Sequence, residues 1–135
     1  MKKVLLIIIF LLSALRVVAP EQKAIFVPHS PPVEPFKKLI HAVGMVEAKG
    51  DTTAFNKIEQ AVGFFQIRPI RVEDYNKRTG SNYLHAEMYD YKISEKIFLY
   101  YASQIGPNNF EHIARNWNGS GPRTTYYWNR VKKYL

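Results

Sequence analysis

One carboxylic acid in this sequence has the surroundings that general acid catalysis requires. Glu47 follows a mostly apolar stretch, Ala-Val-Gly-Met-Val at 42–46, and lies near the end of an expected helix. Desolvation by apolar neighbours and the negative end of the helix dipole both disfavour the carboxylate, so both raise the pKa of Glu47. An acid that keeps its proton near neutral pH can protonate a leaving-group oxygen. An ordinary exposed Glu in a last helical turn is the alternative.

A second segment, Gly-Phe-Phe-Gln-Ile-Arg-Pro at 63–69, places one amide among apolar residues. Because Gln66 lies between Phe65 and Ile67, its polar atoms must find partners or line a pocket. The glycine that opens the segment, followed by aromatic residues, is typical of backbone lying close to a ligand. A core hairpin in which Gln66 bonds to the backbone is the alternative.

Two later segments combine amides with aromatic rings, a combination that suits sugar binding because amides bond hydroxyls and rings pack on apolar sugar faces. Residues 114–121 (ARNWNGSG) contain Trp117 and Asn118, although a helix C-cap followed by a turn would also explain this stretch. Residues 125–131 (TYYWNRV) contain three successive aromatic residues, including Tyr127. Three successive side chains on a helix cannot all face one core, so we expect at least one to face a cleft or solvent.

Taken in order, these four segments resemble the catalytic domain of the soluble lytic murein transglycosylases, a lysozyme-like family. The family pattern is a helix ending in Glu-Ser, a Gly-x-x-Gln segment with a following Pro, then Ala-x-Tyr-Asn-Ala-Gly, and a late Tyr ahead of Val. The matching positions are Glu47-Ala48, the segment 63–69, Ala114 with Trp117-Asn118-Gly119, and Tyr127 four residues before Val131. The resemblance covers about residues 36–135. Ala48 replaces the Ser of the first motif, and the third motif has Trp for Tyr and lacks the second Ala.

The resemblance implies cleavage of peptidoglycan glycan strands at the β-1,4 bond between N-acetylmuramic acid and N-acetylglucosamine. In the family, one Glu protonates the glycosidic oxygen and then activates the sugar's own 6-hydroxyl, which gives a 1,6-anhydro product. By this resemblance Glu47 would be the catalytic acid, Gln66 and Asn118 would line the glycan cleft beside Trp117, and Tyr127 would lie near Glu47. No cofactor is implied.

A hydrolysing glycosidase usually needs a second carboxylate, whereas a transglycosylase of this family does not. Glu59 precedes the segment 63–69 and could face the cleft, so it is the candidate for a second acid or a substrate contact. Asp51 is expected one turn beyond Glu47, and Asp74 and Asp90 at the surface. We therefore expect a lytic transglycosylase. The alternatives are a lysozyme-type hydrolase that uses Glu59 and a non-catalytic peptidoglycan-binding module.

The elements that must position these residues are mostly helices. Apolar spacing, caps and stop signals predict helices from Pro35 to about Gly50, from Ile70 to Arg78 before Gly80, from Ser94 to Gly106-Pro107, from Asn109 to Asn118-Gly119, and from Thr124 or Thr125 onward. In the last helix we expect Tyr127, Val131 and Tyr134 along one side. The apolar run 61–67 could be a strand or a buried turn. Five helices with little or no β-structure predict a small, mainly α single domain, lysozyme-like by the resemblance.

The chain has 135 residues, a net charge of +8 and no cysteine. This length allows one domain, and the lack of Cys excludes disulfides, Cys-ligated metals and thiol nucleophiles. Residues 1–19 have a basic start and 15 apolar residues, which predicts a signal peptide or an uncleaved N-terminal anchor. Residues 20–35 contain five of the eight prolines and are expected to form an extended tether, with the domain at 36–135.

The residues after position 19 carry 16 basic and 11 acidic side chains, a net charge of +5 that suits an anionic partner. We expect an exported monomer, periplasmic or extracellular, whose partner is the glycan strand of peptidoglycan. Contact with a membrane is expected only if the leader is uncleaved, and nucleic acid is not expected because Lys and Arg are spread along the chain. The four His residues, at 29, 41, 85 and 112, show no metal-ligand spacing, so no metal is expected.

Overall fold

Helix α2 (Lys37–Ala48), which carries Glu47, begins directly after the 3-10 turn η1 (Glu34–Phe36). Its buried side chains, among them Leu39, Ile40 and Val43, recur at helical spacing. The helix ends where Lys49 adopts the left-handed conformation, with φ 52°, followed by Gly50 with φ 82°. The prediction of a helix that ends by Gly50 is confirmed. The computed structural model describes residues 31–135, so the predicted leader at 1–19 and most of the tether at 20–35 lie outside the described residues.

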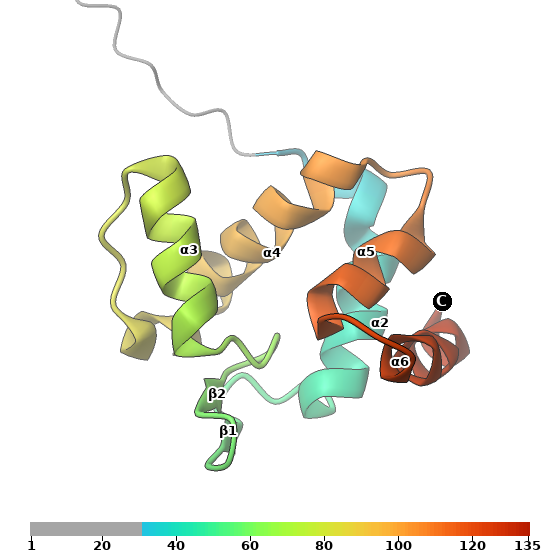
Figure 1. The fold of residues 1–135 in the computed structure, drawn as a ribbon, viewed down its shortest axis with the longest axis horizontal. Helices are drawn as coiled ribbons and strands as arrows, with labels where there is room; N and C mark the ends of the chain where they lie inside the picture. Colours follow the sequence, from blue (N-terminus) through green and yellow to red (C-terminus); the bar gives the residue numbers. More distant parts are fainter. Residues whose placement is uncertain (1–30) are drawn as a thin grey trace, which may run out of the picture.

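The segment 61–67 contains both structures that its sequence left open. Strand β2 (Ala61–Val62) pairs antiparallel with β1 (Phe55–Asn56), and Phe55 lies opposite Val62. The chain then turns at 63–66 and returns, so that Ile67 forms an isolated bridge with Val62. The hairpin lies at the foot of the molecule in Figure 1, between helices α2 and α3.

The remaining helices are α3 (Pro69–Thr79), α4 (Tyr91–Ile105), α5 (Phe110–Asn118) and α6 (Arg123–Val131), with 3-10 turns η2 (His85–Tyr89) and η3 (Lys132–Tyr134). Within residues 31–135, five α-helices and one two-stranded sheet form a small, mainly α single domain, as predicted (Figure 1). None of the helices described in this part of the chain is long and apolar enough to cross a membrane.

The predicted start of α4 at Ser94 is wrong by one turn. Asp90 is the N-cap, because its carboxylate accepts hydrogen bonds from the backbone N–H groups of Lys92 (2.8 Å) and Ile93 (3.1 Å). Ser94 lies inside the helix and is buried. Its hydroxyl donates to the carbonyl oxygen of Tyr91 (3.0 Å), so its polar group is satisfied without a cap position.

The predicted start of α6 is also wrong, whereas that of α5 is confirmed by a hydrogen bond from the His112 N–H to Asn109. No side chain caps α6, and Thr124 lies inside the helix, where its hydroxyl donates to the carbonyl of Gly121 (2.7 Å). Tyr134 was expected along the same side of this helix as Tyr127 and Val131, but it belongs to η3 and is 44% exposed, whereas those two are buried. The chain changes from α to 3-10 geometry after Val131, which turns Tyr134 away from the core.

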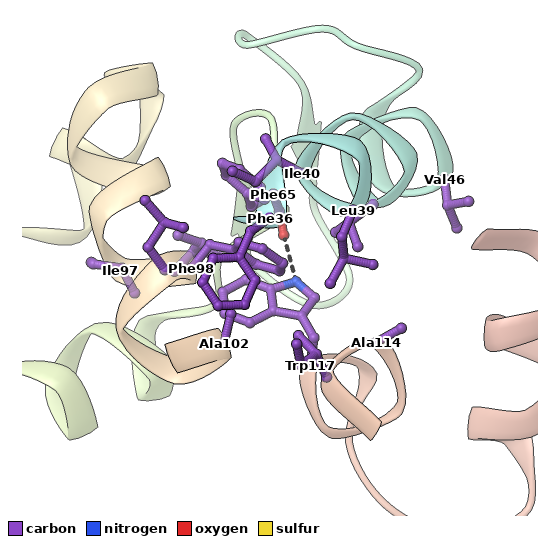
Figure 2. Close-up of a cluster of buried hydrophobic side chains, with 14 of the residues drawn as sticks. Phe36, Leu39, Ile40, Val46, Phe65, Ile97, Phe98, Ala102, Ala114 and Trp117 are labelled. Atoms are coloured by element: carbon purple, nitrogen blue, oxygen red, sulfur yellow. Dashed lines mark hydrogen bonds between the residues drawn. The ribbon is translucent and has the colours of Figure 1, made fainter. Parts of the chain in front are cut away.

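The centre of the core is a group of three aromatic rings drawn in Figure 2. Phe65 stacks on Phe98 with ring centroids 4.8 Å apart, and Trp117 meets both rings edge-on. The indole Nε1–H of Trp117 donates to the carbonyl oxygen of Phe65 at 3.2 Å, the dashed line in Figure 2. This group joins the turn after β2 to helices α4 and α5. It therefore also fixes the next residues along the chain, Gln66 and Asn118.

Gly44 allows the turn after β2 to lie against helix α2. A Cβ atom at this position would clash with the ring of Phe64, which also packs edge-on against Phe65 and Tyr91. Because Gly44 lies three residues before Glu47, the contact brings the turn after β2 to the face of α2 that leads to the carboxyl group.

Candidate active site

Residues from five parts of the chain meet at one cleft. It is lined by the end of α2, the β1–β2 loop, the turn after β2, the start of α3 and the end of α5. Five of the six residues singled out from the sequence line it: Glu47, Glu59, Gln66, Trp117 and Asn118. The sixth, Tyr127, donates a hydrogen bond from its hydroxyl to Glu47 Oε1 at 2.8 Å. The structure therefore brings all six together.

Helix α6 encloses the end of α2 on which Glu47 lies. Tyr127 is buried, with 5% of its surface exposed, and its hydroxyl reaches the carboxyl group from the inner face of α6. One turn further along, Arg130 Nη2 donates to the carbonyl oxygen of Val46 at 3.0 Å. This bond satisfies one of the last carbonyl groups of α2, which have no partner within the helix. Two contacts thus position α6 against the acid, and α6 lies beside the end of α2 in Figure 1.

The pKa of Glu47 is set by opposing effects. Burial raises the pKa of Glu47 to about 7, against the hydrogen bond from Tyr127, which lowers it. The negative charge of Glu59 raises it further, and the positive charges of Arg130 and Arg68 lower it. Burial has the largest effect, so an appreciable share of the molecules holds a neutral acid near pH 7. The increase in pKa predicted from the apolar neighbours of Glu47 is confirmed.

The hydrogen bond from Tyr127 also distinguishes the two oxygen atoms of the acid. Burial, together with the charge of Glu47, raises the pKa of Tyr127, so the phenol keeps its proton and acts as a donor. In the neutral acid Oε1 accepts this bond and is the carbonyl oxygen. Oε2 accepts no hydrogen bond from residues 31–135 and therefore carries the proton.

Replacing Tyr127 with Phe should raise the pKa of Glu47 clearly above 7. The phenol bonds the charged form of the acid, so its loss removes an effect that lowers the pKa. The pKa is measured by NMR titration of the carboxyl carbon. Tyr126→Phe is the matched control, since Tyr126 is 70% exposed and should leave the titration unchanged. A Glu47 that titrates at the same pH in both variants would contradict the assigned hydrogen bond.

Both interpretations of Gln66 apply: its amide bonds to the backbone, and the residue also lines the cleft. Its Nε2 donates to the carbonyl oxygens of Gly63 (3.0 Å) and Ala54 (3.3 Å). The backbone of Gln66 is left-handed, with φ 48°, in a turn opened by Gly63 with φ 74°. A side chain at Gly63 would clash with the carbonyl oxygen of Met88. The turn thus holds the amide nitrogen on the backbone and leaves the amide oxygen for a ligand.

Glu59 is the second carboxylate at the cleft within residues 31–135. It lies on the exposed loop between β1 and β2, and its backbone N–H donates to Asn56 Oδ1 (3.3 Å). The other acids considered from the sequence lie elsewhere: Asp51 bonds Thr53, Asp74 bonds Arg78 and Tyr101, and Asp90 caps α4.

Trp117 and Asn118 end helix α5 at the cleft but differ in exposure. Trp117 is 7% exposed, so its ring packs in the core and presents little surface to a ligand. Asn118 is exposed, and its amide is available to hydroxyl groups. The polar surface that α5 offers to a ligand therefore comes from Asn118.

Two charged residues of the cleft were not singled out from the sequence. Arg68, the N-cap residue before α3, and Arg71 in the first turn of α3 both line the cleft. The guanidinium of Arg71 lies 4.6 Å from the ring centroid of Tyr101 and 4.9 Å from that of Trp117, and its Nη2 donates to the carbonyl oxygen of Trp117 (3.2 Å). For Arg68 the available signal was its place two residues after Gln66 in the same segment, whereas the position of Arg71 depends on how α3 packs against α5.

The part of the chain that the structure describes contains no cluster of three or more His, Asp or Glu side chains arranged to hold a metal ion. No protein-family model matches this chain, and no curated protein and no solved structure matches it either. The geometry of the cleft and the order of the four sequence segments are thus the basis for assigning a function.

Proposed function

We propose that this protein is an exported peptidoglycan lytic transglycosylase with a lysozyme-like architecture. It cleaves the β-1,4 bond between N-acetylmuramic acid and N-acetylglucosamine, with Glu47 as general acid and then general base. One observation carries the proposal: the partly buried carboxyl group of Glu47, whose pKa burial raises to about 7, lines a cleft together with Gln66 and Asn118. The order of the four sequence segments supports it.

The first step breaks the glycosidic bond. Neutral Glu47 donates the proton on Oε2 to the glycosidic oxygen, the bond from that oxygen to C1 breaks, and positive charge develops at C1. Glu47 becomes a carboxylate as the proton leaves. The hydrogen bond from Tyr127 and the charges of Arg130 and Arg68 stabilise that carboxylate, because each of them favours the ionised form.

The second step closes the anhydro ring. The Glu47 carboxylate removes the proton from the 6-hydroxyl of N-acetylmuramic acid, and O6 bonds to C1. The proton returns to Glu47, no water is consumed, and the acid is ready for another cycle. A pKa of about 7 suits a group that must both donate and accept a proton near neutral pH.

A lysozyme-type hydrolase is the second candidate, favoured by one observation. Glu59 lines the same cleft as Glu47, and its charge raises the pKa of Glu47. A carboxylate in this position could act on a water molecule or on the developing charge at C1. The products distinguish the two reactions, because hydrolysis consumes one water for each bond cleaved and leaves a reducing end, whereas ring closure consumes none and leaves an anhydro end.

The test is digestion of purified peptidoglycan by the domain, followed by mass spectrometry of the released fragments. We expect fragments that end in 1,6-anhydro-N-acetylmuramic acid. Reducing ends alone would show the hydrolase. Binding to insoluble peptidoglycan without any released fragment would show a non-catalytic binding module.

A further inference from the structure

Two positive charges of the cleft have no acidic partner. Arg68 is the N-cap residue of α3, Arg71 lies in its first turn, and both line the cleft together with Glu47 and Glu59. Residues 31–135 form four ion pairs, and none of them includes Arg68 or Arg71. Both side chains are only partly exposed. Unpaired cations that are partly withdrawn from water are costly, so their presence here needs an explanation.

Arg71 is held in place by its surroundings. Its guanidinium lies over the rings of Tyr101 and Trp117, and Nη2 donates to the carbonyl oxygen of Trp117. An arginine has five N–H donors, and this bond occupies one. Arg71 therefore ties α3 to the end of α5 and keeps a positive charge at the wall of the cleft.

Arg68 is the more available of the two. Its side chain makes no hydrogen bond within the described part of the chain, whereas its charge acts on both Glu47 and Arg71. With Glu47 neutral, the ionised groups of the cleft are two arginines and Glu59, so the cleft carries a net positive charge. A bound anion would relieve the repulsion between the two arginines. Guanidinium groups match carboxylates in shape, since two parallel N–H groups meet two oxygens.

We propose that Arg68, with Arg71 behind it, binds a carboxylate of the glycan strand and makes the protein specific for strands that carry one. The identity of the strand rests on the proposed function. Two sources of the carboxylate exist in such a strand: the lactyl group of N-acetylmuramic acid, and the peptide that is amide-bonded to it. A neutral chain of N-acetylglucosamine offers neither.

Binding of the carboxylate would also act on Glu47. The charge of Arg68 lowers the pKa of Glu47, so an anion that neutralises Arg68 raises that pKa again. The substrate would thus shift its own acid towards the protonated form, which the first step requires. A neutral sugar would leave Glu47 less protonated at the same pH.

The first experiment measures binding of N-acetylmuramic acid and of its methyl ester, which differ only in the charge of the lactyl group. We expect the acid to bind the wild-type protein at least about tenfold more tightly than the ester, because hydrogen bonds between charged groups contribute about 1.5–3 kcal/mol. In Arg68→Gln the two ligands should bind equally. Arg123→Gln is the matched control, since Arg123 is exposed on α6 and should keep the preference.

Arg68→Lys gives a second variant, which keeps the charge but loses the paired donors, so we expect an intermediate preference. Equal binding of acid and ester to the wild-type protein would exclude the lactyl group as the source. Together with unchanged cleavage of peptide-bearing strands by Arg68→Gln, it would overturn the proposal. An unchanged preference for the acid in Arg68→Gln would also overturn it. NMR spectra of each variant show whether the fold is retained.

The second experiment compares cleavage of strands stripped of peptide, in which the lactyl carboxylate is free, with cleavage of peptide-bearing strands, in which it is an amide. The substrate whose cleavage falls at least about tenfold in Arg68→Gln identifies the source of the carboxylate. Equal cleavage of both substrates by Arg68→Gln and wild type would overturn the proposal.

The experiments can refute the proposed transglycosylase function and the proposed carboxylate site independently of each other. Arg68-dependent binding of N-acetylmuramic acid without any cleavage would refute the proposed function and retain the carboxylate site. Anhydro products together with binding that ignores Arg68 would refute the carboxylate site and retain the function.

Discussion

Replacing Glu47 with Gln should slow the release of soluble fragments from purified peptidoglycan by about a thousandfold, within the range of 10²–10⁴ for general acid–base catalysis. Glutamine has no proton to donate and cannot take one from the 6-hydroxyl, so both steps lose their catalytic group. The amide oxygen can still accept the hydrogen bond from Tyr127, which preserves the local structure. Fragment release is measured under identical conditions for both proteins. Equal activity of Glu47→Gln and wild type would refute the role of Glu47.

Glu59→Gln is the matched control for this experiment, because Glu59 lines the same cleft. In a transglycosylase it should retain activity within about tenfold of wild type, since the 6-hydroxyl replaces the water and the second carboxylate. In a hydrolase that uses Glu59, the loss would approach that of Glu47→Gln. The pair of variants therefore separates the two reactions independently of product analysis.

Replacing Trp117 with Ala should lower the free energy of unfolding by about 3–5 kcal/mol, as is usual for removal of a large buried aromatic side chain. The ring of Trp117 packs against Phe65 and Phe98 in Figure 2, and the substitution also leaves the buried carbonyl of Phe65 without its donor. The free energy of unfolding of a native protein is about 5–15 kcal/mol in total, so this variant should be close to unfolding. Urea denaturation measures the change.

Two further variants serve as comparisons for Trp117→Ala. Trp117→Phe keeps most of the ring and loses the hydrogen bond to Phe65, so we expect a smaller loss of about 1–3 kcal/mol. Trp128→Ala removes a half-buried ring from α6 and should cost less than Trp117→Ala. A stable Trp117→Ala protein that no longer binds glycan would instead assign Trp117 to substrate binding.

The helix ends that could be predicted from sequence are those set by local signals. Gly80 ends α3 in the left-handed conformation, and Asn109 caps α5 through its own side chain. The start of α4 was missed because Asp90 and Ser94 are both good caps and lie one turn apart. Asp90 is the N-cap because its carboxylate accepts hydrogen bonds from two backbone N–H groups. The hydroxyl of Ser94 instead donates to a backbone carbonyl inside the helix.

The residues of the candidate site that could be predicted are those with a recognisable signal in their own sequence segment. Glu47 and Gln66 could be recognised from their neighbours along the chain, and the apolar residues before Glu47 predicted the direction in which burial shifts its pKa. Arg71 could not be placed, because its position depends on how α3 packs against α5. The packing of α3 against α5 is a tertiary contact, and neither segment contains a sequence signal for it.

Tyr127 and Arg130 reach α2 across 80 and 84 residues of chain, from a helix near the end of the described sequence. A ribosome makes the chain from its first residue, so Glu47 is synthesised before Tyr127, whose phenol hydroxyl bonds its carboxyl group. Until α6 has been synthesised and has docked, the carboxyl group lacks its cover and its phenol partner. Two distant parts of the domain must meet before Glu47 has these surroundings, so its raised pKa is a property of the assembled tertiary structure and not of its own helix.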